Sequence, residues 1–184
     1  SSAASDVYKR QVRKREKGRV HLDGFLSYPS AVYTVPYGVM VPKEVDNLLL
    51  PVPVSGSHIG FSTLRMEPCW MAMGQAAGIA SALSIDGKVK VQNINLSRLQ
   101  DKLIDQKATL MYFKDVDYTS PHFRMVQYLG LRGYLPEWTA RLQEPVDATT
   151  LAAWKKLSGT DLPGIEAGKT TRLATLEMIY RKIK

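Results

Sequence analysis

The stretch SGSHIGFSTLRMEPCWMAMGQAAGIASAL, residues 55–83, decides the fold that the sequence predicts. It opens as a polar loop and continues as a long apolar run with Pro68 near its start. Proline is favoured in the first turn of a helix, where its missing N–H costs nothing. An Asp-Gly pair at 86–87 ends the run. We therefore expect a helix that begins near Met66–Pro68 and ends at about Ser84.

This expected helix is rich in small residues, which occupy positions 72, 74, 76–78, 80 and 82. In an exposed helix each glycine costs about 1 kcal/mol relative to alanine. Small residues are useful where another backbone or a flat ligand passes very close to the helix. The composition therefore predicts a helix that is buried on most sides, either beside a ligand or by plain core packing.

The amino end of the expected helix is a candidate binding site for an anion or a polarised carbonyl oxygen. The first N–H groups of a helix have no partners within it, and the helix dipole adds about half a positive charge there. Arg65 adds a full charge, and the loop supplies the hydroxyls of Ser57, Ser62 and Thr63. Such an end suits a ligand whose negative charge grows during a reaction, and a reduced flavin is one such ligand.

The chain before this loop is punctuated by prolines. Residues 19–46 show an apolar alternation interrupted by proline and glycine, which predicts short strands or an edge hairpin. Leu48–Leu50 is typical of a short strand buried on both faces, and Pro51 ends it. The expected order is thus strand, polar loop and helix.

Several separated motifs in residues 28–85 follow one another in a recognisable order. They are Pro36-Tyr37, Val41-Pro42, Val45–Leu49, a serine-flanked His58, Ser62 to Arg65, and Gly74–Gly78. This pattern resembles the end of the flavin domain in FAD-dependent oxidoreductases of the glutathione-reductase-like, two-dinucleotide-binding superfamily. It is similar in particular to the bacterial family of FAD-dependent oxidoreductases.

The resemblance implies an α/β fragment: short β segments, then the last strand and helix of an FAD-binding Rossmann-like domain, in residues 18–92. It implies that the loop lies along the ribityl chain and isoalloxazine of FAD, and that the helix begins at the flavin pyrimidine edge. His58 and Arg65 would be catalytic, with His58 in any acid/base role. The implied cofactor-binding residues are Gly56, Ser57, Ser62, Thr63, Met66, Glu67, Pro68, Gly74, Gln75 and Gly78.

Two features depart from the family pattern. The run PVPVSGS after the expected strand offers only Gly56 for close contact with the ribityl chain. No GxGxxG turn, which binds the cofactor phosphates in such folds, occurs in the sequence. The resemblance therefore implies a missing N-terminal part of the same FAD domain, and a fragment that by itself is inactive and binds FAD weakly or not at all.

Residues 93–184 are expected to form a separate, small all-α module. Asn95 or Ser97 can cap its first helix, which carries a stripe of leucines. The module faintly resembles an S-layer-homology repeat, on Asp115-Val116, His122–Leu131, Gly133 and Thr171-Arg172. Trp138 and Trp154 are expected in the core of the module rather than on a ligand platform.

The composition excludes several classes of function. Residues 1–17 hold six Lys/Arg and two Asp/Glu, so this segment carries half of the net charge of +8. No basic patch with interleaved aromatics occurs elsewhere, so nucleic-acid binding is not expected. The sequence contains no run of eighteen or more apolar residues, so no membrane span is expected. His21 and His122 are expected to be structural, and no metal site is predicted; Cys69, the single cysteine, is expected to be a buried apolar residue.

The start of the chain, SSAASDVYKRQ, resembles translated adapter sequence found in metagenomic reads. Residues 1–17 are therefore interpreted as a non-native or disordered leader and set aside. The sequence predicts the C-terminal part of an FAD-dependent oxidoreductase that transfers hydride from a small organic substrate to FAD. The alternative is a non-catalytic helical module that binds a cell-wall polymer or a protein partner. Neither interpretation specifies a compartment.

Overall fold

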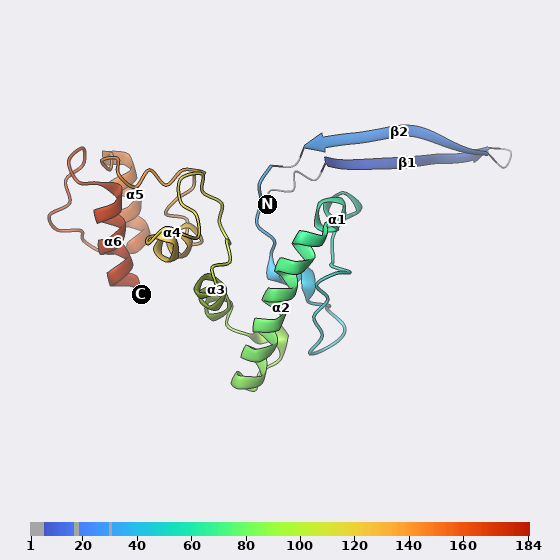
Figure 1. Ribbon diagram of the computed structural model, residues 1–184, viewed down its shortest axis with the longest axis horizontal. Coiled ribbons are helices and arrows are strands. Elements are labelled where there is room, and N and C mark those ends of the chain that lie inside the picture. Colours follow the sequence, from blue (N-terminus) through green and yellow to red (C-terminus); the bar gives the residue numbers. More distant parts are fainter. Residues whose placement is uncertain (1–5, 17–18, 30) are drawn as a thin grey trace. The chain divides into compact units, whose positions relative to one another are not determined.

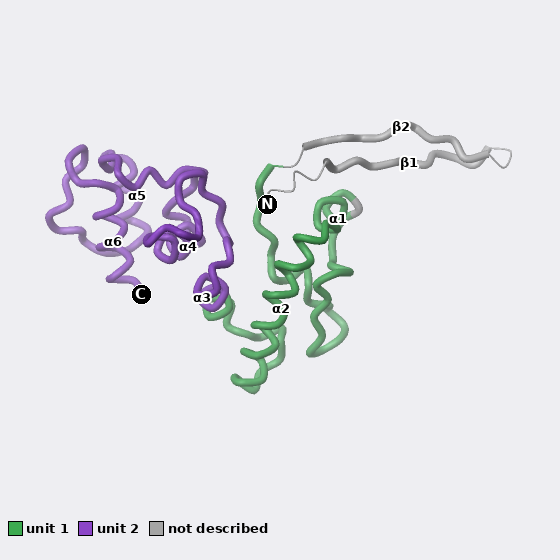
Figure 2. Tube along the Cα trace, in the orientation of Figure 1, with its two compact units in different colours: residues 1–99 green, residues 100–184 purple. Residues whose placement is uncertain are grey.

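The computed structural model describes residues 6–16, 19–29 and 31–184, with side chains from residue 31 onward except that of His58. The chain divides into two compact units, residues 1–99 and residues 100–184 (Figure 2). Helix α3, Leu96–Asp105, runs through this division. The sequence placed a boundary slightly earlier, at residues 92 and 93, and that boundary stays a prediction.

The strands of the first unit form only a hairpin. β1, Asp6–Glu16, pairs antiparallel with β2, Arg19–Pro29 (Figure 1). No described residue from 31 onward lies in a strand, and helices and loops make up that part of the chain. The expected α/β, Rossmann-like fold class was therefore wrong, since the described residues beyond the hairpin form helices and loops with no strand of a parallel sheet. The reading of residues 1–17 as a leader stays a prediction.

The predicted strand Leu48–Leu50 is an irregular segment. Leu50 N–H donates to Met40 O at 2.8 Å, and residues 51–53 then bend away. Pro51 and Pro53 have no N–H to donate to a neighbouring strand, so a regular ladder cannot continue through them. The apolar run is only half-buried, and it packs on the 3₁₀ helix η1, Tyr37–Met40.

Three further helices complete the first unit: α1 (His58–Leu64), α2 (Glu67–Gly87) and the 3₁₀ turn η2 (Val91–Asn93). A small core of apolar side chains joins α1 and α2 to η1, and it is formed by Met40, Val54, Leu64, Met73 and Ala77. The Tyr37 hydroxyl donates to Val91 O at 2.9 Å, and burial raises the pKa of this tyrosine. Beyond its hairpin, the first unit is thus a set of helices with a small core.

Helix α2 has only one buried face. Pro68 lies in its first turn, as predicted, and the helix continues to Gly87 before Lys88 adopts a left-handed conformation with φ of 49°. A Cβ atom built on Gly74 or Gly78 would meet nothing within 4 Å. Ala77 and Ala80 are buried, but nothing among the described residues approaches Gly74 or Gly78, and much of the helix is exposed. The expected burial on most sides was therefore wrong.

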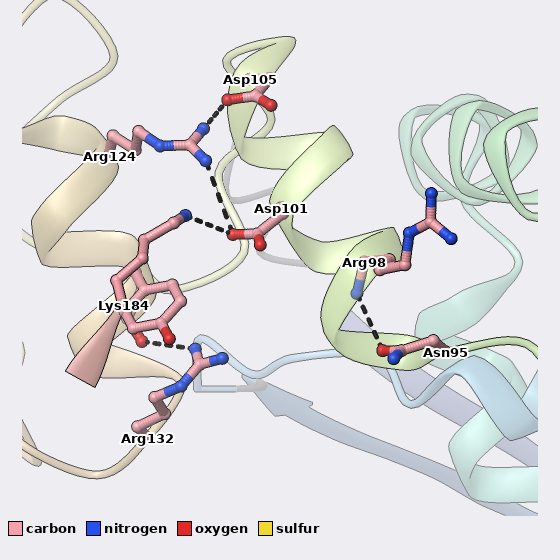
Figure 3. Close-up of polar contacts among 8 residues, drawn as sticks. Asn95, Arg98, Asp101, Asp105, Arg124, Arg132 and Lys184 are labelled. Carbon is pink, nitrogen blue, oxygen red and sulfur yellow. Dashed lines mark hydrogen bonds and ion pairs between the residues drawn. The ribbon is translucent and has the colours of Figure 1, made fainter. Parts of the chain in front are cut away.

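The second unit contains the rest of α3 together with α4 (Phe123–Gly130), α5 (Ala148–Ser158) and α6 (Arg172–Ile183). Asn95 caps α3, as one of the two predicted alternatives, by accepting from Arg98 N–H at 3.1 Å (Figure 3). Asp147 and Thr171 cap α5 and α6 in the same way. The hydrogen bonds from Thr150 lower the pKa of Asp147. Each cap satisfies an N–H group that has no partner within its helix.

Helix α4 lies at the centre of the second unit, and seven of its eight residues are buried. Gln127 is fully buried there, and its side chain holds the segment at residues 110–111. Its Oε1 accepts the N–H groups of Leu110 and Met111, both at 2.8 Å, while Nε2 donates to Met111 O at 2.7 Å. One side chain therefore replaces a strand as the backbone partner of this segment.

The two tryptophans of the second unit have opposite environments. Trp154 is 2% exposed, and its Nε1–H donates to Tyr134 O at 2.7 Å, which confirms the expected core position. The Arg172 guanidinium lies 5.0 Å from the Trp154 ring centroid, and burial lowers the pKa of this arginine. Trp138 is 47% exposed, so the expectation that it lies in the core was wrong.

A charged cluster joins α3 to α4 and to the last residue of the chain (Figure 3). Asp101 lies 2.9 Å from Lys184 Nζ and 3.7 Å from Arg124, and Arg124 also pairs with Asp105. These side chains are about one-third to one-half exposed, so each pair contributes at most about 1 kcal/mol. The cluster orients α3 within the second unit and adds little to its stability.

Candidate functional site

Most of the predicted site residues lie in one short turn of the chain, residues 56–68, which we call the α1–α2 elbow. The expected polar loop is largely the helix α1. Ser57 caps this helix, because its Oγ accepts Gly60 N–H at 3.0 Å. At the other end Arg65 N–H donates to Phe61 O at 3.0 Å. His58 is the first residue of α1, and its side chain lies outside the described residues.

The hydroxyl groups of the elbow are already partly engaged. The Thr63 hydroxyl contacts Gly60 O at 3.4 Å and forms a hydrogen bond with the hydroxyl of Tyr33. Ser62 and Arg65 also take part in interactions, although the Arg65 side chain remains exposed. The elbow is therefore a fixed arrangement of polar groups near the start of α2.

The amino end of α2 has fewer free N–H groups than the sequence suggests. Pro68 has none, and the N–H groups of Cys69 and Trp70 both donate to Met66 O, at 2.9 Å and 3.2 Å. The N–H of Glu67 is the remaining donor of the first turn, and the Glu67 carboxylate lies beside it. The helix dipole favours a negative or polarised group here, while the carboxylate opposes a full negative charge.

The remaining predicted cofactor residues lie along the helix. Gly74, Gln75 and Gly78 belong to a stripe that we call the uncharged face of α2, formed by Met71, Gly74, Gln75, Gly78, Ala82 and Ile85. At 1.5 Å per residue, Gly78 is about 16 Å along the helix from Glu67. The structure thus separates the predicted cofactor residues into an elbow group and a face group.

The uncharged face is apolar and open to solvent within the described residues. Met71 is 74% exposed and Ile85 is 76% exposed. No charged residue occurs between Glu67 and Asp86, which is unusual for an exposed helical face. This combination is typical of a surface that another protein segment covers.

One residue of the elbow region was missed by the sequence analysis. Trp70, in the first turn of α2, packs on the small core of the first unit, and its Nε1–H is buried without a hydrogen-bond partner in the described structure. Buried donors of this kind are rare, so each points to a partner that the described residues do not supply. The sequence feature that could have identified Trp70 is its place directly after the predicted start of the helix.

The elbow itself is not enclosed by the described residues. A shallow hollow of about 440 Å³ lies near the other end of α2, and it contains none of the predicted site residues. Its lining consists of Asn47, Ser81, Ser84, Ile85, Lys88, Val89, Lys90 and Val91. The described residues of the first unit therefore provide at most one wall of a site at the elbow.

Comparison with known families gives the elbow a context. Residues 7–103, just over half of the chain, match the family described as FAD dependent oxidoreductase. The chain belongs to this FAD-dependent oxidoreductase family. The match covers the elbow, all of α2 and most of α3. Neither a curated protein nor a solved structure matches the chain.

Membership of the FAD-dependent oxidoreductase family implies FAD as the cofactor and a flavin-linked redox function. The elbow presents hydroxyl groups, a guanidinium and a helix amino end, which are kinds of group that can hydrogen-bond to the polar edge of a flavin. In the described residues no cluster of three or more His, Cys, Asp or Glu is suited to a metal ion. Nor does any described helix combine the length and apolarity needed to cross a bilayer.

Proposed function

We propose that this chain is part of an FAD-dependent oxidoreductase in which the α1–α2 elbow forms one wall of the flavin site. The family match over residues 7–103 carries the proposal, since it includes the whole elbow. When bound, FAD accepts a hydride from a small organic substrate, and the cofactor supplies this chemistry. The residues of the chain bind the flavin, orient it and polarise it.

The roles of the elbow residues follow from their chemistry. Arg65 carries the positive charge of the elbow, so it stabilises negative charge that develops on the flavin. Ser57, Ser62 and Thr63 provide hydroxyls that orient the cofactor, while Gly56 and the turn Met66–Pro68 allow it to approach the backbone. His58, at the start of α1, exchanges a proton with the substrate.

The second part of the proposal concerns the uncharged face of α2. We assign it to contact with another part of the same FAD-binding domain, which closes the site. Gly74 and Gly78 support this assignment, because nothing in the described structure approaches the position of a Cβ on either residue. The backbone of the covering segment can then lie close to the helix at these two positions. Gln75 lies between them on the same face of the helix.

The proposal is tested by the absorbance spectrum of the protein made from the longest open reading frame that contains this sequence. We expect bands of bound flavin in the purified protein. Arg65→Ala and His58→Ala are expected to keep the flavin and to slow its reduction by substrate at least tenfold, because each removes a group that acts during the reaction. Lys43→Ala, which removes an exposed cation outside the elbow, is the matched control.

Three outcomes would contradict the proposal. A folded, colourless protein that also takes up no added FAD would exclude a flavin site. A yellow protein whose reduction rate is unchanged in both elbow variants would place the reacting groups elsewhere. A rate lowered by Lys43→Ala as strongly as by Arg65→Ala would indicate a general effect of charge.

A further inference from the structure

The second unit carries an exposed aromatic corner formed by Tyr112, Lys114 and Trp138. The rings of Tyr112 and Trp138 lie 6.4 Å apart, centroid to centroid, at an interplanar angle of 80°. Both side chains are exposed, by 43% and 47%. Lys114 Nζ lies 6.0 Å from the centroid of the Trp138 ring. Two large aromatic surfaces that meet nearly at a right angle therefore face solvent beside a single cation.

Backbone hydrogen bonds hold this aromatic corner in place. Lys114 N–H donates to Trp138 O at 2.8 Å, which joins the two loops directly. The Asp115 carboxylate accepts the N–H groups of Ala140 and Arg141, at 2.8 Å and 2.7 Å. A binding surface that is fixed in advance loses little conformational entropy when a ligand arrives. The position of the exposed rings is thus set by the fold.

Two of the three polar side-chain groups of the corner can only donate, and the third, the Tyr112 hydroxyl, can donate as well as accept. Neither the Tyr112 hydroxyl nor Trp138 Nε1–H has a hydrogen-bond partner among the described residues, and Lys114 Nζ forms no ion pair with them. An indole N–H and an ammonium group can only donate. The corner therefore suits a ligand that presents acceptors and has few donors of its own.

The carboxylates near the corner are already engaged. Asp115 binds two backbone N–H groups, Asp117 accepts from the backbone and hydroxyl of Thr119, and Glu137 pairs with Arg141 at 2.6 Å. A neutral saccharide donates from its hydroxyls and needs acceptors, which are scarce here. An acidic polymer would be attracted by Lys114 alone among the three corner residues, and the carboxylates of Asp115 and Asp117, which form no ion pair with the described residues, would oppose its charge.

We propose that the aromatic corner binds a proline-rich segment of a partner protein in the polyproline II conformation. Proline has a backbone carbonyl and no N–H, so such a segment is rich in acceptors and poor in donors. Its rings pack on the exposed faces of Tyr112 and Trp138, and its carbonyls accept from the indole, the phenol and Lys114. The segment is extended before it binds, so little ordering entropy is lost.

The size of the surface agrees with a short ligand. A stable interface between two folded proteins buries about 800 Å² on each partner and requires some 20–30 residues a side. The corner consists of three side chains with polar surroundings, and Leu157 on α5 is the one strongly exposed aliphatic side chain of the described second unit. A peptide of a few residues is thus a better occupant than a folded domain.

The test uses the ¹⁵N-labelled chain of 184 residues and the peptide decaproline. The three tryptophans give three indole N–H signals, and the signal that disappears in Trp138→Phe identifies Trp138. We expect decaproline to shift this signal with a dissociation constant of about 1 mM or lower. The signal of Trp154 should stay in place, because its N–H is bonded inside the core.

Variants of the corner refine the test. Trp138→Ala is expected to weaken decaproline binding at least tenfold, and Tyr112→Phe, which removes only the hydroxyl, severalfold. Leu157→Ala, an exposed change on α5, is the control and should bind as the unmodified chain does. All of these side chains are exposed, so unchanged circular dichroism spectra will show that the fold is kept.

Three results would overturn the proposal. The first is a Trp138 signal that does not respond to decaproline. The second is equal binding of decaproline and a glycine-serine decapeptide, which would show that proline is not recognised. The third is tighter binding of cellohexaose or an oligogalacturonate than of decaproline, which would assign the corner to a polysaccharide.

Discussion

The variant Gln127→Leu is expected to lower the free energy of unfolding of the second unit by about 3 kcal/mol or more. Leucine leaves three partly buried backbone groups of Leu110 and Met111 without their side-chain partner, and each such loss costs about 1–3 kcal/mol. Packing does not recover the loss, because the backbone segment that these bonds hold has no other partner for its polar groups. Urea unfolding followed by circular dichroism measures the change.

The exposed Gln143 provides a matched control for this prediction. Gln143→Leu makes the same chemical change at the surface of the second unit and should alter the stability by less than about 0.5 kcal/mol. A stability loss of similar size in both variants would show that leucine itself, and not the three hydrogen bonds, is responsible. An unchanged unfolding midpoint in Gln127→Leu would contradict the account of α4 as the centre of the unit.

The variant Gly78→Leu is expected to have opposite effects in two forms of the protein. In the chain of 184 residues a Cβ at this position meets nothing within 4 Å, and leucine favours helix over glycine by about 1 kcal/mol. This chain should therefore become slightly more stable. In the flavoprotein from the longer reading frame, leucine would occupy the space of the covering segment, and the protein should lose its bound FAD.

Absorbance of the purified flavoprotein and thermal unfolding of the chain measure the two effects. Ala153→Leu, at an exposed position of α5, is the matched control and should leave the flavin in place. A flavoprotein that retains its FAD with leucine at residue 78 would contradict the proposed cover over the uncharged face, while the role of the elbow would remain open to its own test.

Local sequence signals were enough to place the longest helix. Pro68 at the start of α2 and the Asp-Gly pair near its end are read from neighbouring residues, and the structure follows them closely. The cap by Asn95 is likewise a local signal. Helix α1 was missed, because a serine-capped helix of seven residues is hard to distinguish from a polar loop. A short apolar run such as Leu48–Leu50 does not distinguish strand from half-buried coil either.

Tertiary contacts decide the features that the sequence could not supply. The residue types in the elbow indicated a polar site, but the occupied N–H groups at the start of α2 depend on the actual turn at Met66. The sequence did not distinguish the two tryptophans of the second unit. The Trp154 indole N–H donates to the carbonyl of Tyr134, whereas Trp138 lies on a loop whose carbonyl accepts from Lys114 N–H. Such differences arise from partners distant in sequence.

The exposed Met71 allows the covering of the uncharged face to be measured by methionine oxidation. Peroxide converts accessible thioethers to sulfoxides, and buried methionines react more slowly. Met71 is 74% exposed, whereas Met40, Met73 and Met125 are 3%, 4% and 6% exposed. Peptide mapping after mild oxidation should thus find Met71 oxidised far ahead of these three in the 184-residue chain. In the flavoprotein Met71 should be oxidised slowly, because the covering segment would bury its thioether. The oxidation rate of Met71 therefore reports whether the uncharged face is covered.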